Sequence, residues 1–524
     1  MKKTSTGRSA LLVAIGILCS RLTGLVRLRV FAHYFGLQSD AADAFNAAFR
    51  IPNFLQNLFG EGALSASFIP VYAALVARGR PGAADRVAGA VASLLALAVS
   101  ILVLIGVVAT SLIIALIAPG FVGAKRDLTV EIVRVLFPGA GLLVLSAWCL
   151  GVLNSHQRFL LSYTAPVIWN AVMIGTLLWF GRQSALPRLA VLLAWGSVIG
   201  SALQVAVQLP AVLQVAPDLR FRLDVSSEDV RGVARNFAPV LISRGVVQTS
   251  AYIDAVLASL LPTGAVTGLA NAQILYTLPI SLFGMSVSAA ELPVMAGAAD
   301  PDSSGYAALR QRLNNGLRQI AFFVVPSAMA FLALGDVIAG ALLQTGRFTH
   351  ANALYVWGIL AGSAVGLVAS TLGRLYASTF YALRDTRTPL RYALVRVVLT
   401  TVLGYLFALP LPRLLGFPAE WGAAGLTVSA GLAGWVEMSM LRGGLNARIG
   451  HTGLAAGYVI KLWAASAIGA VVAWAVKLAL APANPLIAAV AILGPYGIVF
   501  VAAVLAFRVP EARGVFGRVF RLGS

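Results

Sequence analysis

The stretch VAGAVASLLALAVSILVLIGVVATSLIIALI, residues 87–117, contains no charged side chain. About 20 apolar residues are enough for a helix to cross the hydrocarbon core of a bilayer, so this stretch predicts a membrane span. Similar apolar runs recur from one end of the chain to the other. Of its 524 residues, 59% are hydrophobic and only 11% are charged, and the mean hydropathy is +0.87. A soluble protein carries about 25% charged residues, so the composition excludes a large water-soluble enzyme.

The apolar runs predict an all-α polytopic membrane protein with about fourteen transmembrane helices. We read the first run as a retained span and not as a cleaved leader, because no A-x-A-like cleavage site follows it. The predicted spans are 11–36, 51–77, 87–117, 132–154, 159–180, 189–214, 236–260, 267–297, 319–343, 352–381, 392–409, 421–441, 454–478 and 485–507.

The net charge of +20 is explained by membrane topology and not by nucleic acid, because the basic residues lie in short loops between spans. With the N-terminus placed in the cytoplasm, the loops on its side hold 23 Lys and Arg residues and the opposite loops hold 7. Cytoplasmic loops are enriched in Lys and Arg. We therefore expect a multi-pass protein with both termini in the cytoplasm.

Three sequence features recur 223 residues apart, with six predicted spans between the partners. The pairs are Ser20-Arg21 with Ser243-Arg244, Pro70-Val71 with Pro293-Val294, and Pro166 with Pro389. The even number of spans predicts a parallel repeat about an axis along the membrane normal, although prolines also gather at helix ends without any repeat. The predicted division is an N-lobe at 1–214, a cytoplasmic connector at 215–235, a C-lobe at 236–447, and two further spans with a cytoplasmic tail at 448–524.

Three arginines, Arg21, Arg27 and Arg244, lie several residues from either end of their predicted spans. A charged side chain at the centre of a membrane helix normally faces the protein interior or a water-filled cavity. Guanidinium groups bind phosphate or pyrophosphate through paired hydrogen bonds. We therefore predict that these arginines line a site for an anionic substrate.

Several acids also lie within the predicted membrane segments. Glu61, flanked by Gly60 and Gly62, is read either as part of the substrate site or as the partner of an arginine in the first span. Its two glycines permit close helix packing or a local break. Asp254, Glu291 and Glu437 are candidate ion or proton sites, and each is equally readable as a paired core acid.

The chain lacks the patterns that would indicate an enzyme, a cofactor or a metal site. There is no G-x-x-x-x-G-K-[ST] sequence, no H-E-x-x-H sequence and no cluster of cysteines and histidines. We expect no cofactor, no metal, no nucleic-acid partner and no catalytic activity. The driving force would then be the membrane potential, an ion gradient or removal of the product.

Long stretches of the chain resemble the MurJ/MviN lipid II flippases of the MATE-like flippase and exporter (MOP) superfamily. The similar stretches are SRLTGLVR at 20–27, FG at 35–36, ADAF at 42–45, FRIPN at 49–53, FGEGALSASFIP at 59–70, NSHQRF at 154–159, AP at 165–166 with Asn170, and FYALRDTRTP at 380–389. The resemblance implies fourteen helices in two six-helix lobes plus a C-terminal pair.

The same resemblance implies a function in peptidoglycan and cell-wall biogenesis, and hence in cell shape. Lipid II, the undecaprenyl-pyrophosphate-linked precursor, would move from the cytoplasmic to the periplasmic leaflet of the bacterial inner membrane by alternating access. A cationic central cavity would hold its head group, and the last two helices a groove for its tail. By this resemblance Arg21, Arg27, Asp43 and Glu61 are substrate-binding residues. Membrane lipids and cell-wall synthesis proteins are implied as partners.

The chain departs from the family pattern at three positions. Leu28 stands where an acid is frequent, and Gln56 and Ile274 stand where basic residues are expected. We hypothesise that Arg244 compensates for the missing cations. The alternatives are an ion-coupled exporter, or a flippase of another lipid-linked oligosaccharide, on the same scaffold. A third alternative is a structural scaffold in a cell-wall synthesis complex.

Overall fold

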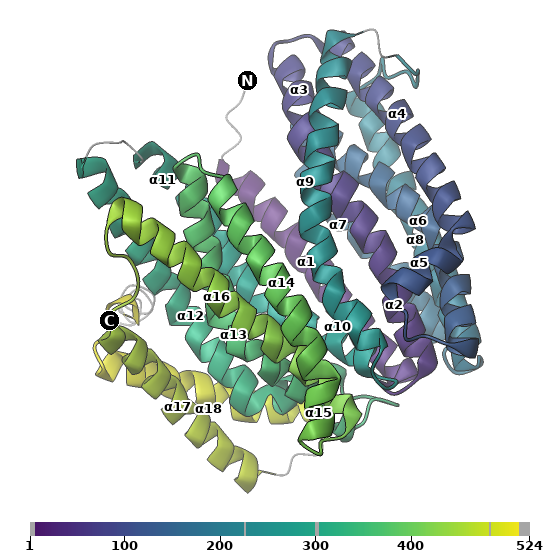
Figure 1. Cartoon of the computed structure of the whole chain (residues 1–524). Coiled ribbons are helices and arrows are strands. Elements are labelled where there is room, and N and C mark those ends of the chain that lie inside the picture. Colours follow the sequence, from purple (N-terminus) through teal and green to yellow (C-terminus); the bar gives the residue numbers. More distant parts are fainter. Residues whose placement is uncertain (1–5, 225–226, 299–302, 481–483, 513–524) are drawn as a thin grey trace. The chain divides into compact units, whose positions relative to one another are not determined.

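The computed structural model describes residues 6–224, 227–298, 303–480 and 484–512, and all regular structure within these ranges is helical (Figure 1). The all-α prediction is confirmed. The first helices are α1 (Thr6–Phe35), α2 (Asp40–Leu55), η1 (Gln56–Leu64), α3 (Ser65–Ala77), α4 (Pro81–Val108), α5 (Thr110–Ile117), α6 (Gly123–Ser155), α7 (Phe159–Phe180) and α8 (Leu186–Val215). They are followed by α9 (Glu228–Ser259), α10 (Ala265–Pro279), η2 (Ile280–Met285), α11 (Ser286–Ala298), α12 (Ser303–Leu343), α13 (His350–Ala382), α14 (Arg387–Ala408), α15 (Pro410–Leu414), η3 (Ala419–Trp421), α16 (Gly422–Ile449), α17 (Ala456–Ala479) and α18 (Pro485–Ala506).

Each of the predicted spans coincides with one helix or with a series of consecutive helices. Among the described residues, 10 helices are long and apolar enough to cross a membrane, or 11 if the bent series from α2 to α3 counts as one span. The protein is therefore a multi-pass membrane protein. The number fourteen stays a prediction.

Hydropathy alone predicts that some helices begin too late in the sequence, because their first turns are polar. The second span was predicted from residue 51, but α2 already begins at Asp40. Ser39 has an extended backbone and its hydroxyl accepts a hydrogen bond from the Ala42 N–H at 3.2 Å, as expected of an N-cap. Asp43 and Arg50 therefore lie within a helix, where the sequence analysis had placed Arg50 in a loop.

Two of the membrane segments are interrupted by π-helices at matching places in the chain. The first, η1, contains Gly60, and a Cβ atom built there would lie 2.6 Å from that of Ala147 on α6. The glycines near Glu61 thus permit both the local break and the close packing that the sequence predicted. The second, η2, follows at about the 223-residue spacing of the sequence repeat. The segments that flank η1 bend by 42°.

The chain forms two compact units, which we describe separately. The first comprises residues 1–266 together with the turn Thr345–Phe348, and the second comprises the remaining residues. The boundary lies within α10. The division into lobes, connector and C-terminal pair stays a prediction.

In the first unit, α6 and α8 pack closely, as do α1 with α7 and α2 with α6. Small residues permit this proximity, as is common between membrane helices. A Cβ atom at Gly196 on α8 would meet the Thr176 hydroxyl of α7 at 2.4 Å, and one at Gly106 on α4 would overlap the ring of Phe137 on α6. The turn Thr345–Phe348 is fixed to the end of α1, where the Arg347 N–H donates to the His33 carbonyl at 2.9 Å.

In the second unit, α13 lies between α12 and α16, and a Cβ atom at Gly366 would lie 2.4 Å from the Gly431 Cα atom. The C-terminal helices α17 and α18 pack on α12, which is kinked at Leu334. Near the kink, the Lys477 ammonium of α17 pairs with the buried carboxylate of Asp336 at 2.5 Å. The Trp474 indole donates to the Ala333 carbonyl at 2.8 Å. Polar contacts therefore anchor the last helices of this unit within the membrane.

The loop before α14 is held by Asp385. Its carboxylate accepts hydrogen bonds from the Thr388 hydroxyl at 2.7 Å and from the Thr388 N–H at 3.0 Å, and Arg448 pairs with it at 2.7 Å. These contacts favour the ionised carboxylate and lower the pKa of Asp385 to about 2. Asp385 therefore stabilises the start of α14 while it is ionised.

We expect Asp385→Asn to lower the melting temperature at pH 5–7, because the substitution removes the charge that Thr388 and Arg448 stabilise. The unfolded-state pKa of an aspartate is about 3.9, so the contribution is fully present above that pH and is lost as the pH falls towards 2. Melting curves of both proteins should therefore converge between about pH 4 and pH 2. Asp127→Asn, at an exposed acid of α6, is the matched control; a difference that did not shrink in acid would contradict the assignment.

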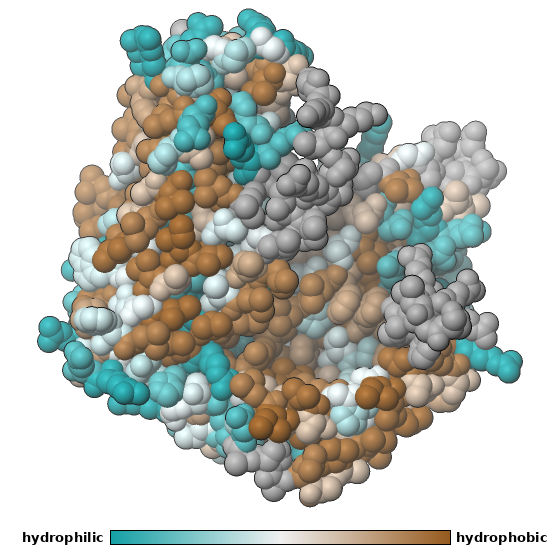
Figure 2. Space-filling view, turned by 180° about the vertical axis from the view of Figure 1, so that it is seen from behind, coloured by the Kyte–Doolittle hydropathy of each residue, from teal (hydrophilic) through white to brown (hydrophobic). Residues whose placement is uncertain are grey.

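Hydrophobic side chains cover much of the face in Figure 2. Large apolar residues on α4 and α5 are widely exposed, among them Leu104, Val108, Leu112 and Leu116. Apolar exposure on this scale is too large for a soluble monomer. It is typical of helices that contact lipid.

Candidate functional site

Arg27 lies half-buried where three helices of the first unit meet. Its guanidinium carbon is 5.0 Å from the ring centroid of Phe49 on α2 and 5.0 Å from that of Trp169 on α7. Its Nη1 group donates to the Met173 sulfur at 3.3 Å, and a thioether is a weak acceptor. Among the described residues no carboxylate pairs with Arg27. Most of its N–H donors are therefore available to a ligand.

The aromatic rings attract this cation but offer it no hydrogen-bond acceptor. A central arginine costs at least about 2.5–3.5 kcal/mol in the membrane, and each of its two cation–π contacts offsets about 0.5–2 kcal/mol. A bound anion would supply charge-assisted hydrogen bonds that the protein does not. The surroundings of Arg27 therefore favour an anionic ligand.

Arg21 lies on the same helix and is exposed, which is compatible with its predicted role in binding an anion. Glu61 lies in η1 and Arg244 in α9, but the side chains of both fall outside the described residues. The predicted roles of these residues stay predictions. Gln56 and Ile274 occupy the two positions where the family has cations. Gln56 is the first residue of η1, and Ile274 is a 39% exposed residue of α10.

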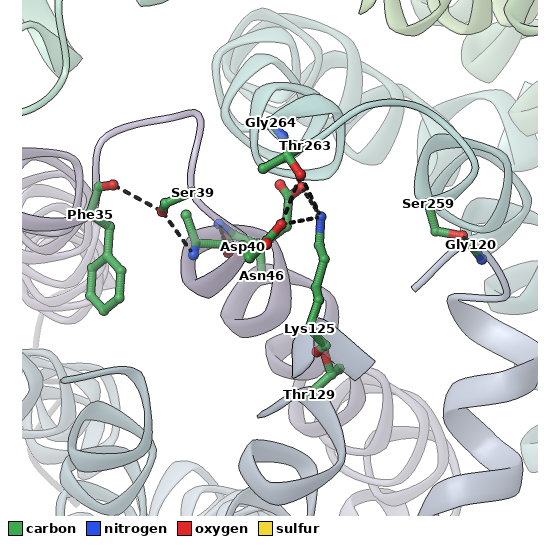
Figure 3. Close-up of polar contacts among 12 residues, drawn as sticks. Phe35, Ser39, Asp40, Asn46, Gly120, Lys125, Thr129, Ser259, Thr263 and Gly264 are labelled. Atoms are coloured by element: carbon green, nitrogen blue, oxygen red, sulfur yellow. Dashed lines mark hydrogen bonds and ion pairs between the residues drawn. The ribbon is translucent and has the colours of Figure 1, made fainter. Parts of the chain in front are cut away.

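Asp43 belongs to a partly exposed polar cluster at the start of α2, and Figure 3 labels its neighbours Asp40, Lys125, Thr263 and Gly264. Its side chain is 1% exposed and pairs with the Lys125 ammonium at 2.8 Å. The same carboxylate oxygen accepts a hydrogen bond from the Gly264 N–H at 2.9 Å. Asp40 pairs with Lys125 at 3.2 Å and accepts a hydrogen bond from the Thr263 hydroxyl at 2.8 Å.

This cluster joins three segments that lie far apart in the sequence: the first turns of α2 and α6, and the loop before α10. Figure 3 shows the Lys125 side chain extending towards Asp40 and Thr263. The ring of Phe121 also faces the Lys125 ammonium, at 4.4 Å. The arrangement favours a structural role for Asp43, and its predicted contact with substrate stays a prediction.

Arg50 is a buried cation that the sequence analysis did not select. Its Nη2 atom is buried and forms no hydrogen bond within the described residues, and its guanidinium interacts electrostatically with Asp254. The Tyr252 hydroxyl donates to the Arg50 carbonyl at 2.9 Å. Arg50 and Tyr252, with Ser259, line a small cavity of the first unit. The serine and aspartates at 39, 40 and 43 could have revealed the early helix start, and with it the buried arginine.

Each acid predicted as an ion or proton site faces an arginine. Asp254 interacts with Arg50, Glu291 lies 3.8 Å from Arg312, and Glu437 pairs with Arg396 at 2.9 Å. These contacts agree with the reading of paired core acids, while the coupling role stays a prediction. Among the described residues, no group of three metal-ligating side chains is present.

The second unit contains another basic group, Arg374 and Arg396, which lie in the predicted spans 352–381 and 392–409 and were not among the residues predicted to bind substrate. Hydropathy placed Arg396 near the end of a span that began at residue 392, but α14 begins at Arg387. Arg396 therefore lies well inside its helix. Arg374 on α13 interacts electrostatically with both Arg396 and Glu437, so two arginines share one carboxylate here.

Comparisons with known proteins agree in one family. The family model described as "Lipid II flippase MurJ" matches residues 31–493. The "Lipid II flippase MurJ" of Burkholderia cenocepacia is 32% identical over 448 residues, which cover 84% of each chain. The "Probable lipid II flippase MurJ" of Rhizobium meliloti is 32% identical over 447 residues, covering 83% of this chain and 79% of that one.

Solved structures show the same fold. The structure "Lipid II flippase MurJ, inward closed conformation" matches with a TM-score of 0.77 at 23% identity, over 95% of this chain and 99% of that one. A multidrug resistance MATE family transporter of the MOP superfamily matches in an inward-facing conformation with a TM-score of 0.65, at 16% identity over 84% of this chain and 98% of that one. An outward-facing one matches with a TM-score of 0.56, at 16% identity over 85% and 97%.

Proposed function

The chain belongs to the lipid II flippase MurJ family, and we propose that it moves lipid II from the cytoplasmic to the periplasmic leaflet of the bacterial inner membrane. The family and its MATE-like relatives are transporters, so the chain is a transporter and not an enzyme. The family name also places it in peptidoglycan biosynthesis.

The observation that carries the proposal is the state of Arg27. It is a membrane-embedded cation that contacts two aromatic rings and one thioether, and no carboxylate among the described residues neutralises it. The pyrophosphate of lipid II offers the acceptor oxygens that a guanidinium binds best. Arg27, with the exposed Arg21, would hold this group, and Arg244 and Glu61 would complete the cationic cavity.

Transport would proceed by alternating access, with the cavity open to one leaflet at a time. The support is the MATE-like fold, which has been solved in both inward-facing and outward-facing states for other transporters. The chain has no nucleotide-binding sequence, so the driving force would be the membrane potential, an ion gradient or removal of the product. Both termini would lie in the cytoplasm, because the predicted loops on the same side as the termini are the ones rich in Lys and Arg, and such loops are cytoplasmic. Cell-wall synthesis proteins would be its partners.

The decisive experiment is complementation of bacterial cells depleted of their own lipid II flippase. We expect the chain to restore growth and rod shape, and to restore the exposure of lipid II on the periplasmic face to an added lipid II-cleaving enzyme. The measurement compares this exposure with the amount of protein in the membrane. Without a flippase the lipid-linked head group stays inside, since transfer of a charged glycopeptide through hydrocarbon is prohibitive.

Absence of rescue by a correctly inserted protein would contradict the proposal. In that case purified protein in vesicles, tested with other polyprenyl-linked oligosaccharides, would identify the substrate. Gln56 and Ile274, where the family cations are missing, would be the first residues to exchange for arginine or lysine.

A further inference from the structure

We propose that Trp169 is a positioning residue that fixes the guanidinium of Arg27 for the anionic head group of the substrate. The proposal rests on the proposed function, and it assigns to a side chain on α7 the orientation of a cation on α1. We name the pair Phe49 and Trp169 the aromatic platform. Its two rings stack with 5.6 Å between centroids and 9° between planes.

The geometry makes Arg27 and the platform a single unit. The guanidinium carbon lies 5.0 Å from both centroids, so it forms a nearly equilateral triangle with the two rings. A planar guanidinium stacks on aromatic rings, whereas an ammonium is a compact point charge. Contact with both rings restricts the rotation of the Arg27 side chain.

Contacts with α8 fix the orientation of Trp169. Its indole N–H donates to the Ser197 carbonyl at 3.1 Å and to the Ser197 hydroxyl at 3.2 Å. One turn along α8 is Gly200, where a Cβ atom would lie 2.8 Å from the Trp169 Cδ1 atom and 3.1 Å from its backbone. Only glycine lets the indole and the helix backbone approach this closely. The orientation of Trp169 is therefore fixed independently of Arg27.

Phe49 is fixed from the other side by a series of stacked rings. Phe49 stacks on Phe45 at 5.3 Å, Phe45 contacts Phe31 at 5.4 Å, and Phe31 stacks on Phe35 at 4.4 Å. The last three rings are buried. Both members of the platform are thus held by rigid neighbours, which is the condition for a preorganised binding group.

The surroundings of the platform contain a further unused polar atom. Asn170, next to Trp169, is buried, and its side-chain oxygen has no hydrogen-bond partner among the described residues. Its amide approaches the Thr23 hydroxyl, one turn before Arg27, at 3.5 Å. A buried unsatisfied acceptor is rare. Beside the Arg27 cation, this α1–α7 contact thus also contains a buried acceptor that the described residues leave unsatisfied.

The first test measures the coupling without substrate. Trp169→Leu should lower the melting temperature of the purified protein by several degrees, and the loss should be clearly smaller in the Arg27→Met background, because the residues act together. Trp169→Phe keeps an aromatic face and should retain most of the stability. Trp179→Leu, at a 74% exposed tryptophan of the same helix, is the matched control. Equal losses from Trp169→Leu in both backgrounds would overturn the proposed coupling.

The second test measures affinity for lipid II by native mass spectrometry. Trp169→Leu should weaken binding about two- to thirtyfold, which is the range expected for one cation–π contact. Trp169→Phe should restore affinity, and Trp179→Leu should not change it. In the Arg27→Ala background, Trp169→Leu should have no additional effect, because a positioning residue acts only through the cation.

The outcomes separate this proposal from the proposed function. Loss of affinity with Arg27→Ala but not with Trp169→Leu would overturn the positioning role alone. A loss with Trp169→Leu that persists without Arg27 would also overturn it. Unchanged affinity in Arg27→Ala would contradict the binding role of Arg27 itself, and with it the role of Trp169, whatever the melting temperatures show.

Discussion

Arg27→Ala is expected to abolish the rescue of flippase-depleted cells and to reduce lipid II flipping in vesicles by about 30-fold to a few thousandfold. Removing one partner of a buried, hydrogen-bonded charge pair costs about 2–5 kcal/mol, and 1.4 kcal/mol corresponds to a factor of ten. Among described residues, no other charged side chain contacts the Phe49 and Trp169 rings, so none is placed to replace the lost guanidinium. The measurement is the initial rate of lipid II transfer, normalised to the amount of protein in the membrane.

Two further variants show whether the loss is specific. Arg182→Ala removes an exposed arginine from the turn between α7 and α8 and should leave transport unchanged. Arg27→Lys keeps the charge but loses the planar fork and should recover only a small part of the activity. Wild-type flipping by Arg27→Ala would show that the anion binds elsewhere, with Arg50 and Arg374 as the next candidates.

Lys125→Met is expected to destabilise the protein by about 3–5 kcal/mol, the range for breaking a buried ion pair from one side. The substitution would remove the Lys125 ammonium from the Asp43 carboxylate, which is only 1% exposed, while the contact with the Gly264 N–H stays. It would also detach the start of α6 from the start of α2 and from the Thr263 hydroxyl. Denaturant unfolding in detergent micelles measures the loss.

The neighbouring Arg126 provides the matched control. Its guanidinium donates to the Ser111 hydroxyl at 2.8 Å in an exposed contact, so Arg126→Met should change stability by less than about 1 kcal/mol. Asp43→Asn combined with Lys125→Met should recover part of the loss, because no buried charge then stays unpaired. Equal effects of Lys125→Met and Arg126→Met would show that the cluster of Figure 3 contributes no special stability.

The approximate positions of the membrane helices could be predicted, because each contains a long run of apolar residues. Their ends could not, because a polar first turn such as Asp40–Asp43 reads as a loop until the Ser39 cap is recognised. This single error placed Arg50 outside the membrane. The start of α14 at Arg387 likewise moves Arg396 from the end of its predicted span to the interior of the helix.

The candidate site could be predicted only as a set of cations. Arg27 was identified from its place in a span, but its platform depends on Trp169, which is distant in sequence and carries no charge. The Lys125 partner of Asp43 was likewise beyond prediction, since it sits in another turn. Spacing along one helix gives the type of chemistry, whereas partners from other helices decide whether a charge is neutralised.

The two π-helices change how any substitution scan of this protein must be interpreted. An α-helix places a side chain every 100°, whereas a π-helix, whose hydrogen bonds span five residues, turns by only about 80° per residue. Through η1 the side chains therefore turn less than in a continuous α-helix of the same length. A helical wheel drawn for α2 therefore assigns the residues of α3 to the wrong directions. We expect the positions that tolerate polar substitutions to follow one helical periodicity before Gln56 and a shifted one after Leu64. A scan that assumes one continuous periodicity would mistake lipid-facing positions for protein-facing ones.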